Sequence, residues 1–151
     1  MVTNGSRIDR RWLDKHGPYL RWLTLSIDSV DAERARQLGR HAGPISYRHP
    51  DHILEVAELV HAWNSIRPRQ RQIRLKLNVT VTSLNADEDP SAFIERMRPS
   101  KVKLLQMLVV QGENDGEEGL QCSAVSFASY AHRMQSVAGV EIVSEDNEAM
   151  D

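Results

Sequence analysis

The feature that most constrains the fold of this 151-residue chain is an alternation of strand-like and helix-like segments. Segment 73–82 shows the strand pattern most clearly, because apolar residues such as Leu75 and Leu77 alternate with polar residues such as Lys76 and Asn78. Further strands are expected at 1–3, 22–27, 101–110 and 140–144. Short connections and the handedness of strand–helix–strand units favour a single parallel sheet. The sequence therefore predicts one α/β domain.

Helices are expected between these strands, with ends marked by capping residues and prolines. Pro50-Asp51 opens the clearest of them, Ile53 and Trp63 belong to its apolar stripe, and Pro68 stops it. The remaining expected segments are helices at 7–16, 31–38, 89–99 and 123–137 and a loop at 40–50. Loops of about a dozen residues are uncommon unless they serve a function or move.

A series of parallel strands and helices closes into a (β/α) barrel or fills a doubly wound sheet, and this chain is about 100 residues short of a typical barrel. Residues 1–3 look like the end of a buried strand, and residues 145–151 form a polar tail, so both ends look cut. We expect residues 1–151 to form one partial barrel domain. Its unpaired edge strands predict that the isolated chain is marginally stable and either self-associates through these edges or unfolds with weak cooperativity.

Charge and cysteine content exclude several classes of function. The chain carries 19 Lys and Arg against 21 Asp and Glu, a net charge of −2, which argues against a general nucleic-acid binder. Its one cysteine, Cys122, excludes an internal disulfide and any site built from two thiolates of this chain. No stretch approaches the roughly 18 consecutive apolar residues of a membrane-spanning helix. These features predict a cytoplasmic protein.

Ligands of parallel α/β barrels gather where the strands end. This rule nominates the polar stretches 4–6, 28–29, 80–85, 111–114 and 145–147. In segment 73–82 the apolar face should meet the helices, which leaves Lys76 and Asn78 facing the barrel interior. A lysine buried there needs an anionic partner, either a phosphate or carboxylate ligand or an acidic side chain of the protein; the other alternative is that it lies on an exposed face of an incomplete sheet. Lys101 and Lys103 share one face of the next strand, where they either join Lys76 in a polyphosphate pocket or form a solvated strand entrance.

Three other groups of residues have structural explanations that the sequence favours. The arginines between residues 67 and 74 lie around a helix-to-strand loop and are expected to be solvated surface rather than nucleic-acid contacts. His49 and His52 could belong to a metal site, but without a third ligand they are expected to mark the start of a helix. Cys122 is expected to be an inert thiol.

Six short motifs occur in order along essentially the whole chain. They are Val2-Thr3-Asn4-Gly5-Ser6, Leu25-Ser26-Ile27-Asp28-Ser29, Gln37-Leu38-Gly39-Arg40, Leu75-Lys76-Leu77-Asn78, Pro99-Ser100-Lys101-Val102-Lys103 and Gly112-Glu113-Asn114. Together the motifs resemble the later strands of the viperin-like radical S-adenosylmethionine enzymes. The resemblance implies a radical-enzyme barrel of which this chain covers the region of strands 4 to 8, without the N-terminal part that binds the iron–sulfur cluster.

The resemblance also implies a reaction. Viperin-like enzymes act in antiviral defence and use S-adenosylmethionine bound to a [4Fe–4S] cluster to make a 5′-deoxyadenosyl radical. The radical takes a hydrogen atom from the ribose of CTP, and loss of water gives a didehydro chain-terminating nucleotide. Some relatives associate with the endoplasmic reticulum membrane through an upstream helix.

Site residues follow from the same resemblance. Asn4 and Ser6 match the strand-end Asn-Gly-Ser that contacts S-adenosylmethionine, and Arg40 matches the arginine that reaches its methionine carboxylate. Lys101 stands where the family can carry an arginine, which keeps the charge but loses the planar fork of donors. The residues that match phosphate-binding positions are Lys76, Asn78, Lys101 and Lys103.

The sequence departs from the family in two places. The Cys-x3-Cys-x2-Cys loop that ligates the cluster is absent, and Cys122 alone cannot replace it. The downstream segment whose aromatic residue covers the nucleotide is also missing. The resemblance therefore predicts a fragment that is not catalytic by itself. The alternatives are another radical S-adenosylmethionine enzyme with a different anionic substrate, or a shortened non-catalytic protein that binds a nucleotide or a protein partner.

Overall fold

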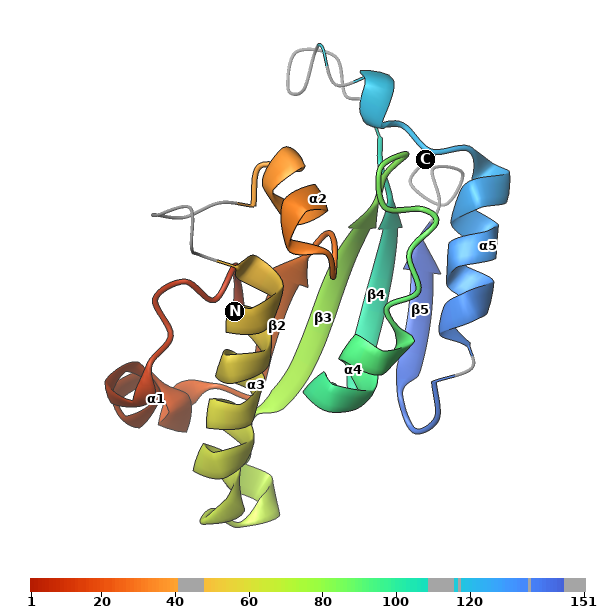
Figure 1. Ribbon diagram of the computed structural model, residues 1–151. Coiled ribbons are helices and arrows are strands. Elements are labelled where there is room, and N and C mark those ends of the chain that lie inside the picture. Colours follow the sequence, from red (N-terminus) through yellow and green to blue (C-terminus); the bar gives the residue numbers. More distant parts are fainter. Residues whose placement is uncertain (41–47, 109–115, 117, 136, 146–151) are drawn as a thin grey trace.

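The computed structural model describes residues 1–40, 48–108, 116, 118–135 and 137–145. Its centre is a five-stranded parallel sheet whose spatial order, β1-β2-β3-β4-β5, follows the order of the strands in the sequence (Figure 1). The strands are β1 (Val2–Thr3), β2 (Trp22–Ile27), β3 (Arg74–Val81), β4 (Lys101–Gln106) and β5 (Glu141–Glu145). This order is that of a barrel wall, because a doubly wound sheet reverses direction once. The predicted parallel α/β fold is confirmed.

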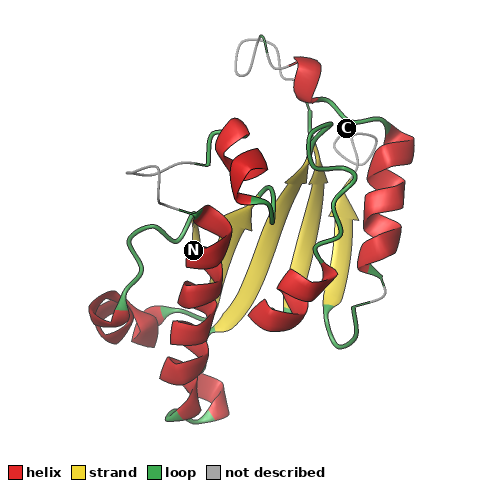
Figure 2. Cartoon of the chain, in the orientation of Figure 1, coloured by secondary structure: helices red, strands yellow, loops and turns green. Residues whose placement is uncertain are grey.

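Helical segments alternate with the strands (Figure 2). Asp9 caps the first helix by accepting a hydrogen bond from the N–H of Trp12 at 2.6 Å, so this helix begins at Arg10, three residues later than expected. The α-helices are α1 (Arg10–His16), α2 (Ala32–Gln37), α3 (His49–Ser65), α4 (Ser91–Met97) and α5 (Ala124–Met134). The 3-10 turns are η1 (Gly17–Tyr19), η2 (Arg69–Arg71) and η3 (Glu118–Leu120).

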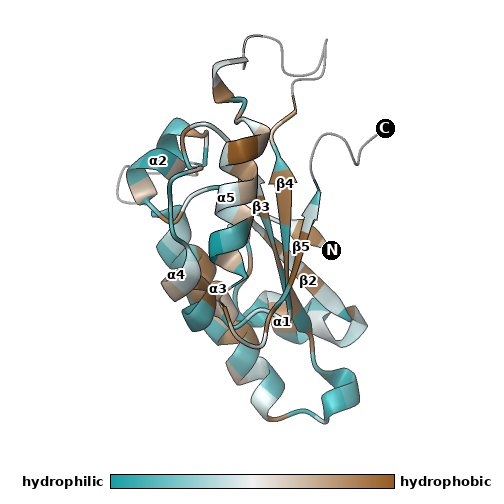
Figure 3. Ribbon diagram, turned by 90° about the vertical axis from the view of Figure 1, so that its right-hand side faces the viewer, coloured by the Kyte–Doolittle hydropathy of each residue, from teal (hydrophilic) through white to brown (hydrophobic). Residues whose placement is uncertain are grey.

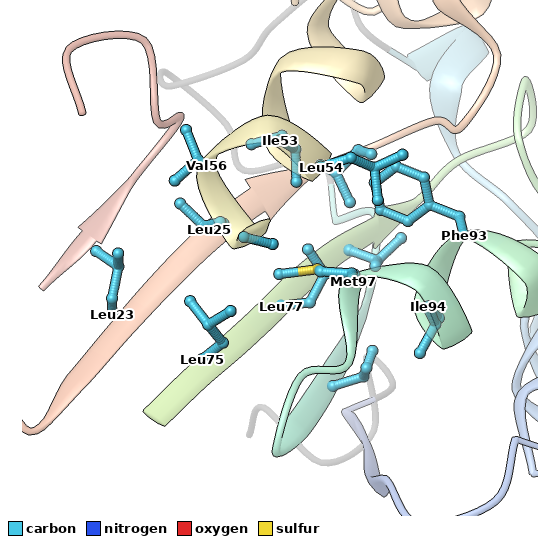
Figure 4. Close-up of a cluster of buried hydrophobic side chains, with 14 of the residues drawn as sticks. Leu23, Leu25, Ile53, Leu54, Val56, Leu75, Leu77, Phe93, Ile94 and Met97 are labelled. Carbon is cyan, nitrogen blue, oxygen red and sulfur yellow. The ribbon is translucent and has the colours of Figure 1, made fainter. Parts of the chain in front are cut away.

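Helices α3, α4 and α5 lie on one face of the sheet, which we call the helix-covered face (Figure 3). Side chains from alternate strand positions, such as Leu25 and Leu77, meet Ile53 of α3 and Met97 of α4 there (Figure 4). Each of these four side chains is at most 1% exposed. Burial of apolar surface of this kind is the main stabilising contribution in a parallel α/β domain.

The opposite face, which we call the open face, carries the other half of each strand. In β3, Arg74 is exposed and the following positions of this face are half-buried, while the positions between them are buried. Lys76 and Asn78 lie on this face, as the alternation of residues 73–82 predicted. The open face is the side that a complete barrel would enclose, and it positions the candidate site.

Strand β4 is shorter than expected. It ends at Gln106, whereas the sequence predicted that it extends to residue 110. Residues 109 and 110 of the predicted strand lie outside the described part of the chain. The carbonyl of Val81, the last residue of β3, accepts a hydrogen bond from the N–H of Met107 at 2.9 Å. Beyond this bond β3 turns away, so β4 loses its neighbour on that side and the ladder stops.

Candidate functional site

Polar side chains of three neighbouring strands form two rows across the open face. Thr24 of β2, Lys76 of β3 and Lys101 of β4 are paired in register in one row. Partners in a parallel ladder share a face, so the next row along the strands brings Ser26, Asn78 and Lys103 together in the same way. The structure therefore places all four expected phosphate-binding residues on one surface.

Lys76 and Asn78 each present a polar group on this surface that lacks a partner in the described part of the chain. Among the described residues, no carboxylate and no hydrogen-bond acceptor pairs with the Lys76 ammonium. The Oδ1 atom of Asn78 is buried and has no hydrogen-bond partner in the same part of the chain. Buried polar atoms are nearly always paired in native proteins, so an orphan beside an unpaired cation indicates a place that a ligand or water fills.

The two lysines of β4 differ from Lys76 because each has a carboxylate partner on β5. The Nζ atom of Lys101 lies 2.8 Å from an oxygen of Glu141, and the Nζ atom of Lys103 lies 2.6 Å from an oxygen of Glu145. The lysine side chains are 29% and 25% exposed, respectively. Lys101 and Lys103 are therefore not merely solvated residues at the start of a strand. Each forms an ion pair within the protein, which was one of the alternatives that the sequence allowed for Lys76.

The Asn4-Gly5-Ser6 turn lies where β1 ends. Gly5 has a φ of 77°, a conformation that glycine adopts without strain. The N–H of Ser6 donates to Oδ1 of Asn4 at 3.1 Å, which closes the turn locally. Two histidines at the start of α3 contact the backbone of this turn. Nε2 of His49 lies 3.2 Å from the carbonyl oxygen of Asn4, and Nε2 of His52 lies 3.0 Å from that of Gly5.

These contacts give the two histidines a structural role at the start of α3, as expected. Burial lowers the pKa of His49, and the positive charges of Arg40 and His52 lower this pKa further. The hydrogen bond to Asn4 and the negative charge of Asp28 oppose the shift. The imidazole of His49 is thus favoured in its neutral form, in which its Nε2–H donates to the turn.

Arg40 pairs with Asp28 at the end of β2, with 2.5 Å between its Nε and an oxygen of the carboxylate. The other carboxylate oxygen, Oδ1, is buried and has no hydrogen-bond partner among the described residues. Asn85 fixes this corner, because its side chain donates to the carbonyls of both Asp28 and Thr80. Asp28, Gly39 and Thr80 contribute to the wall of a small hollow of about 320 Å³ beside the open face.

Sequence reasoning nominated the stretch around Asp28 but did not identify Asp28 as the partner of Arg40. It also missed Glu88, a buried carboxylate that accepts hydrogen bonds from the Ser29 hydroxyl and from the N–H of Val30 at 3.1 Å. Burial raises the pKa of Glu88 despite these bonds. The acidic run of residues 87–89 was the only sequence signal, and it does not distinguish the buried member.

Residues that could hold a metal are not clustered in the described part of the chain, where no three His, Cys, Asp or Glu side chains come together. Cys122 is buried, its thiol lies 3.4 Å from the carbonyl oxygen of Val81, and burial raises the pKa of the thiol. The nominated stretch 111–114 and residues 146–147 lie outside the described residues.

A second hollow lies at the opposite end of the sheet, where the strands begin. Arg21, Trp22, Arg69 and Arg74 are among the residues that line it, and the guanidinium of Arg74 lies 5.5 Å from the ring centre of Trp22. Arg69, Arg71 and Arg74 are exposed, as expected for solvated surface. Arg67 departs from that expectation, because its side chain is 25% exposed, lies 3.4 Å from the ring centre of Trp63 and donates to the Trp63 carbonyl. No described helix is long and apolar enough to cross a membrane.

Comparison with known proteins gives relatives along almost the entire chain, although no protein-family model matches it. The chain is 33% identical over 136 residues to an S-adenosylmethionine-dependent nucleotide dehydratase of Flammeovirga pacifica, covering 88% of this chain and 43% of that protein. It is 32% identical to dehydratases of the same name from Siniperca chuatsi and from a Thermoplasmatales archaeon, covering 99% of this chain and 41% and 50% of those proteins. The chain thus spans half or less of these relatives.

Among solved structures, the fold matches part of a radical S-adenosylmethionine methyltransferase from Sphaerobacter thermophilus with a TM-score of 0.59. The match covers 96% of this chain and 39% of the methyltransferase chain at 13% sequence identity. The five parallel strands and their helices therefore have the arrangement of part of a radical-enzyme barrel.

Proposed function

We propose that this chain, a homologue of the S-adenosylmethionine-dependent nucleotide dehydratases over nearly its whole length, provides the part of such an enzyme that holds a nucleoside triphosphate and one end of S-adenosylmethionine. In the complete enzyme, the proposed reaction converts CTP to a didehydro chain-terminating nucleotide. The observation that carries the proposal lies on the open face, where, among the described residues, the Lys76 ammonium has no partner and the buried Oδ1 atom of the neighbouring Asn78 has none either.

The triphosphate suits this surface on electrostatic grounds. An ammonium group that is half-buried without a counter-ion is destabilised, and a phosphate oxygen would supply the missing negative charge. The amide of Asn78 presents both a donor and an acceptor, so it can bond a phosphate oxygen or a hydroxyl of the nucleotide. Lys101 and Lys103 in the adjacent strand add two further positive charges within the same two rows.

The S-adenosylmethionine end of the proposed site is the corner formed by Asp28 and Arg40. The methionine part of that cofactor carries an ammonium and a carboxylate group. Asp28 has one buried carboxylate oxygen without a partner among the described residues, and the guanidinium of Arg40 has further donors besides the one that binds Asp28. The Asn4-Gly5-Ser6 turn flanks this corner, since both the turn and the Asp28–Arg40 pair act on His49.

The residues present do not fit a [4Fe–4S] cluster. Such a cluster is held by several thiolates, and the sequence contains one cysteine, which is buried against a backbone carbonyl. No radical step is therefore derived from these residues. The binding of substrate and of S-adenosylmethionine is the part of the reaction that they can carry out.

The single cysteine also favours a second candidate function, in which these residues bind the nucleotide without radical chemistry. Both candidates predict that the 151-residue chain loads no cluster, which iron and sulfide assays after anaerobic reconstitution measure. Stoichiometric loading of the 151-residue chain with four irons would contradict nucleotide binding without radical chemistry. It would also contradict the conclusion that these residues do not fit a [4Fe–4S] cluster.

Calorimetric titration with CTP tests the proposed binding surface. The wild-type chain should bind CTP, and Lys76→Gln should weaken binding at least about tenfold, because a charged hydrogen bond contributes about 1.5–3 kcal/mol. Lys15→Gln, which removes an exposed lysine from α1, is the matched control and should leave the affinity unchanged. Equal affinities of wild type and Lys76→Gln would place the nucleotide elsewhere.

A further inference from the structure

Strand β5 places two carboxylates beside the candidate phosphate site: Glu145, which belongs to the nominated stretch 145–147, and Glu141, which sequence reasoning did not identify. Glu141 stands directly opposite Lys101 in the β4–β5 ladder. Glu145 lies two positions beyond the partner of Lys103 and reaches back to its ammonium at 2.6 Å. All four side chains project from the open face, so the two glutamates line the same surface as Lys76.

The ion pairs change the charge that an incoming anion meets. Of the three lysines on the open face, only Lys76 has no carboxylate partner among the described residues. A polyphosphate that contacts Lys103 has to approach the carboxylate of Glu145, and two negative groups on one ammonium repel each other. Phosphate can thus pair with the Lys103 ammonium only when the Glu145 carboxylate moves away from it.

We infer that Glu145 is a counter-ion that competes with substrate phosphate for Lys103, and that this competition limits the affinity of the site for triphosphates. The inference rests on the proposed function, since it concerns the same surface. Glu145 reduces the positive charge of the empty site and holds Lys103 in place on β4. When the triphosphate binds, its oxygens replace the Glu145 carboxylate as the partner of the ammonium.

The competition should be stronger at Glu145 than at Glu141. The Glu145 side chain is 37% exposed and its lysine partner 25%, whereas the Glu141 side chain is 61% exposed. Water screens the more exposed pair, so its carboxylate is displaced more easily. The 2.6 Å distance at Lys103 is also the shorter of the two contacts.

Titration of the 151-residue chain with CTP and with inorganic tripolyphosphate tests the inference. Glu145→Gln should tighten binding of both anions about 5-fold, and Glu141→Gln about 2-fold. Glu58→Gln removes an exposed charge from α3 on the helix-covered side and should change neither affinity. A double-mutant cycle supplies the decisive control: the gain from Glu145→Gln should vanish when Lys103 is also replaced by Gln.

Each outcome separates this inference from the proposed function. Unchanged or weaker binding by Glu145→Gln, while the wild type binds CTP and Lys76→Gln does not, would overturn the competition and leave the proposed function standing. If Glu145→Gln still tightens binding when Lys103 is also replaced by Gln, the competition is overturned as well, because the gain in affinity would then come from a general change in charge. Lack of triphosphate binding by every variant would instead remove the proposed function on which the inference rests.

Discussion

The two faces of the sheet are built from the same strands and have opposite properties. On the helix-covered face, Leu75 and Leu77 are 2% and 1% exposed and pack in a continuous apolar core. On the open face, the intervening Lys76 and Asn78 are half-buried and lack partners in the described part of the chain. Neighbouring positions along β3 thus alternate between side chains that pack in the core and polar side chains that we propose bind a ligand.

This difference shows that stability and binding occupy separate sides of one element. Apolar contacts of the helix-covered face are complete without any ligand, so their loss should destabilise the fold directly. On the open face, Lys101 and Lys103 already have carboxylate partners. Lys76 and the Oδ1 atom of Asn78 have none among the described residues, and we propose that an anion supplies them. Substitutions on the two faces should therefore separate the free energy of unfolding from ligand affinity.

The largest expected effect is in the core. Leu77→Ala should lower the free energy of unfolding by about 3 kcal/mol, because it removes buried methyl groups and leaves a cavity between β3 and the helices. Ser26→Ala, at a half-buried position of the open face, should lower it by less than about 0.5 kcal/mol. Urea unfolding followed by circular dichroism measures both. Similar losses in the two variants would contradict the separation of the faces.

A smaller effect on stability is expected at the Asn4-Gly5-Ser6 turn, which His49 contacts. His49→Gln should lower the free energy of unfolding by about 1 kcal/mol at pH 7.5, the contribution of a typical hydrogen bond. The folded-state pKa of His49 is lowered from 6.5, so the unfolded state takes up a proton first as pH falls. The wild type should therefore lose stability below about pH 6.5 relative to His49→Gln.

Urea unfolding at pH 7.5 and at pH 5.5 measures this change, and the difference between the two proteins isolates His49. Glu88 has a raised pKa, so its contribution to stability is present at low pH and is lost as pH rises. That contribution is common to both proteins and cancels in the comparison. A gap between the proteins that is the same at both pH values would contradict a lowered His49 pKa.

The smallest effect on stability is expected at the ion pair of Lys101 with Glu141. Lys101→Gln should lower the free energy of unfolding by less than about 0.5 kcal/mol, because the Glu141 side chain is 61% exposed and the pair is screened by water. The same variant should weaken CTP binding measurably in calorimetry. A large loss of stability without a change in affinity would assign Lys101 to the fold rather than to the site.

Much of the fold could be predicted from the sequence because alternation is a local property. Residues 73–82 show which side chains face the core without knowledge of any other strand, and the structure confirms that division. The end of β4 could not be predicted in this way, because it depends on where β3 turns away at Val81. Apolar content alone extended β4 beyond the point at which its neighbour ends.

The candidate site was predictable in its members but not in its pairings. Lys76 and Asn78 were identified by their positions on one strand. The contact of Lys103 with Glu145 depends on the register between two strands, and that of Asp28 with Arg40 depends on the path of the chain through α2. Ion pairs between distant parts of the chain are set by the tertiary fold, so they cannot be predicted from the alternation of residues along one strand.

Backbone amide chemical shifts during a CTP titration test the central claim most directly, namely that the open face is the anion-binding surface. The largest shifts should lie around Lys76, Asn78 and Lys103, and in Lys76→Gln they should require at least about tenfold more CTP to reach the same size. Core amides of α3 and α4 should change little. Shifts confined to the arginine-lined hollow at Arg21 and Arg74, where the strands begin, would contradict the claim.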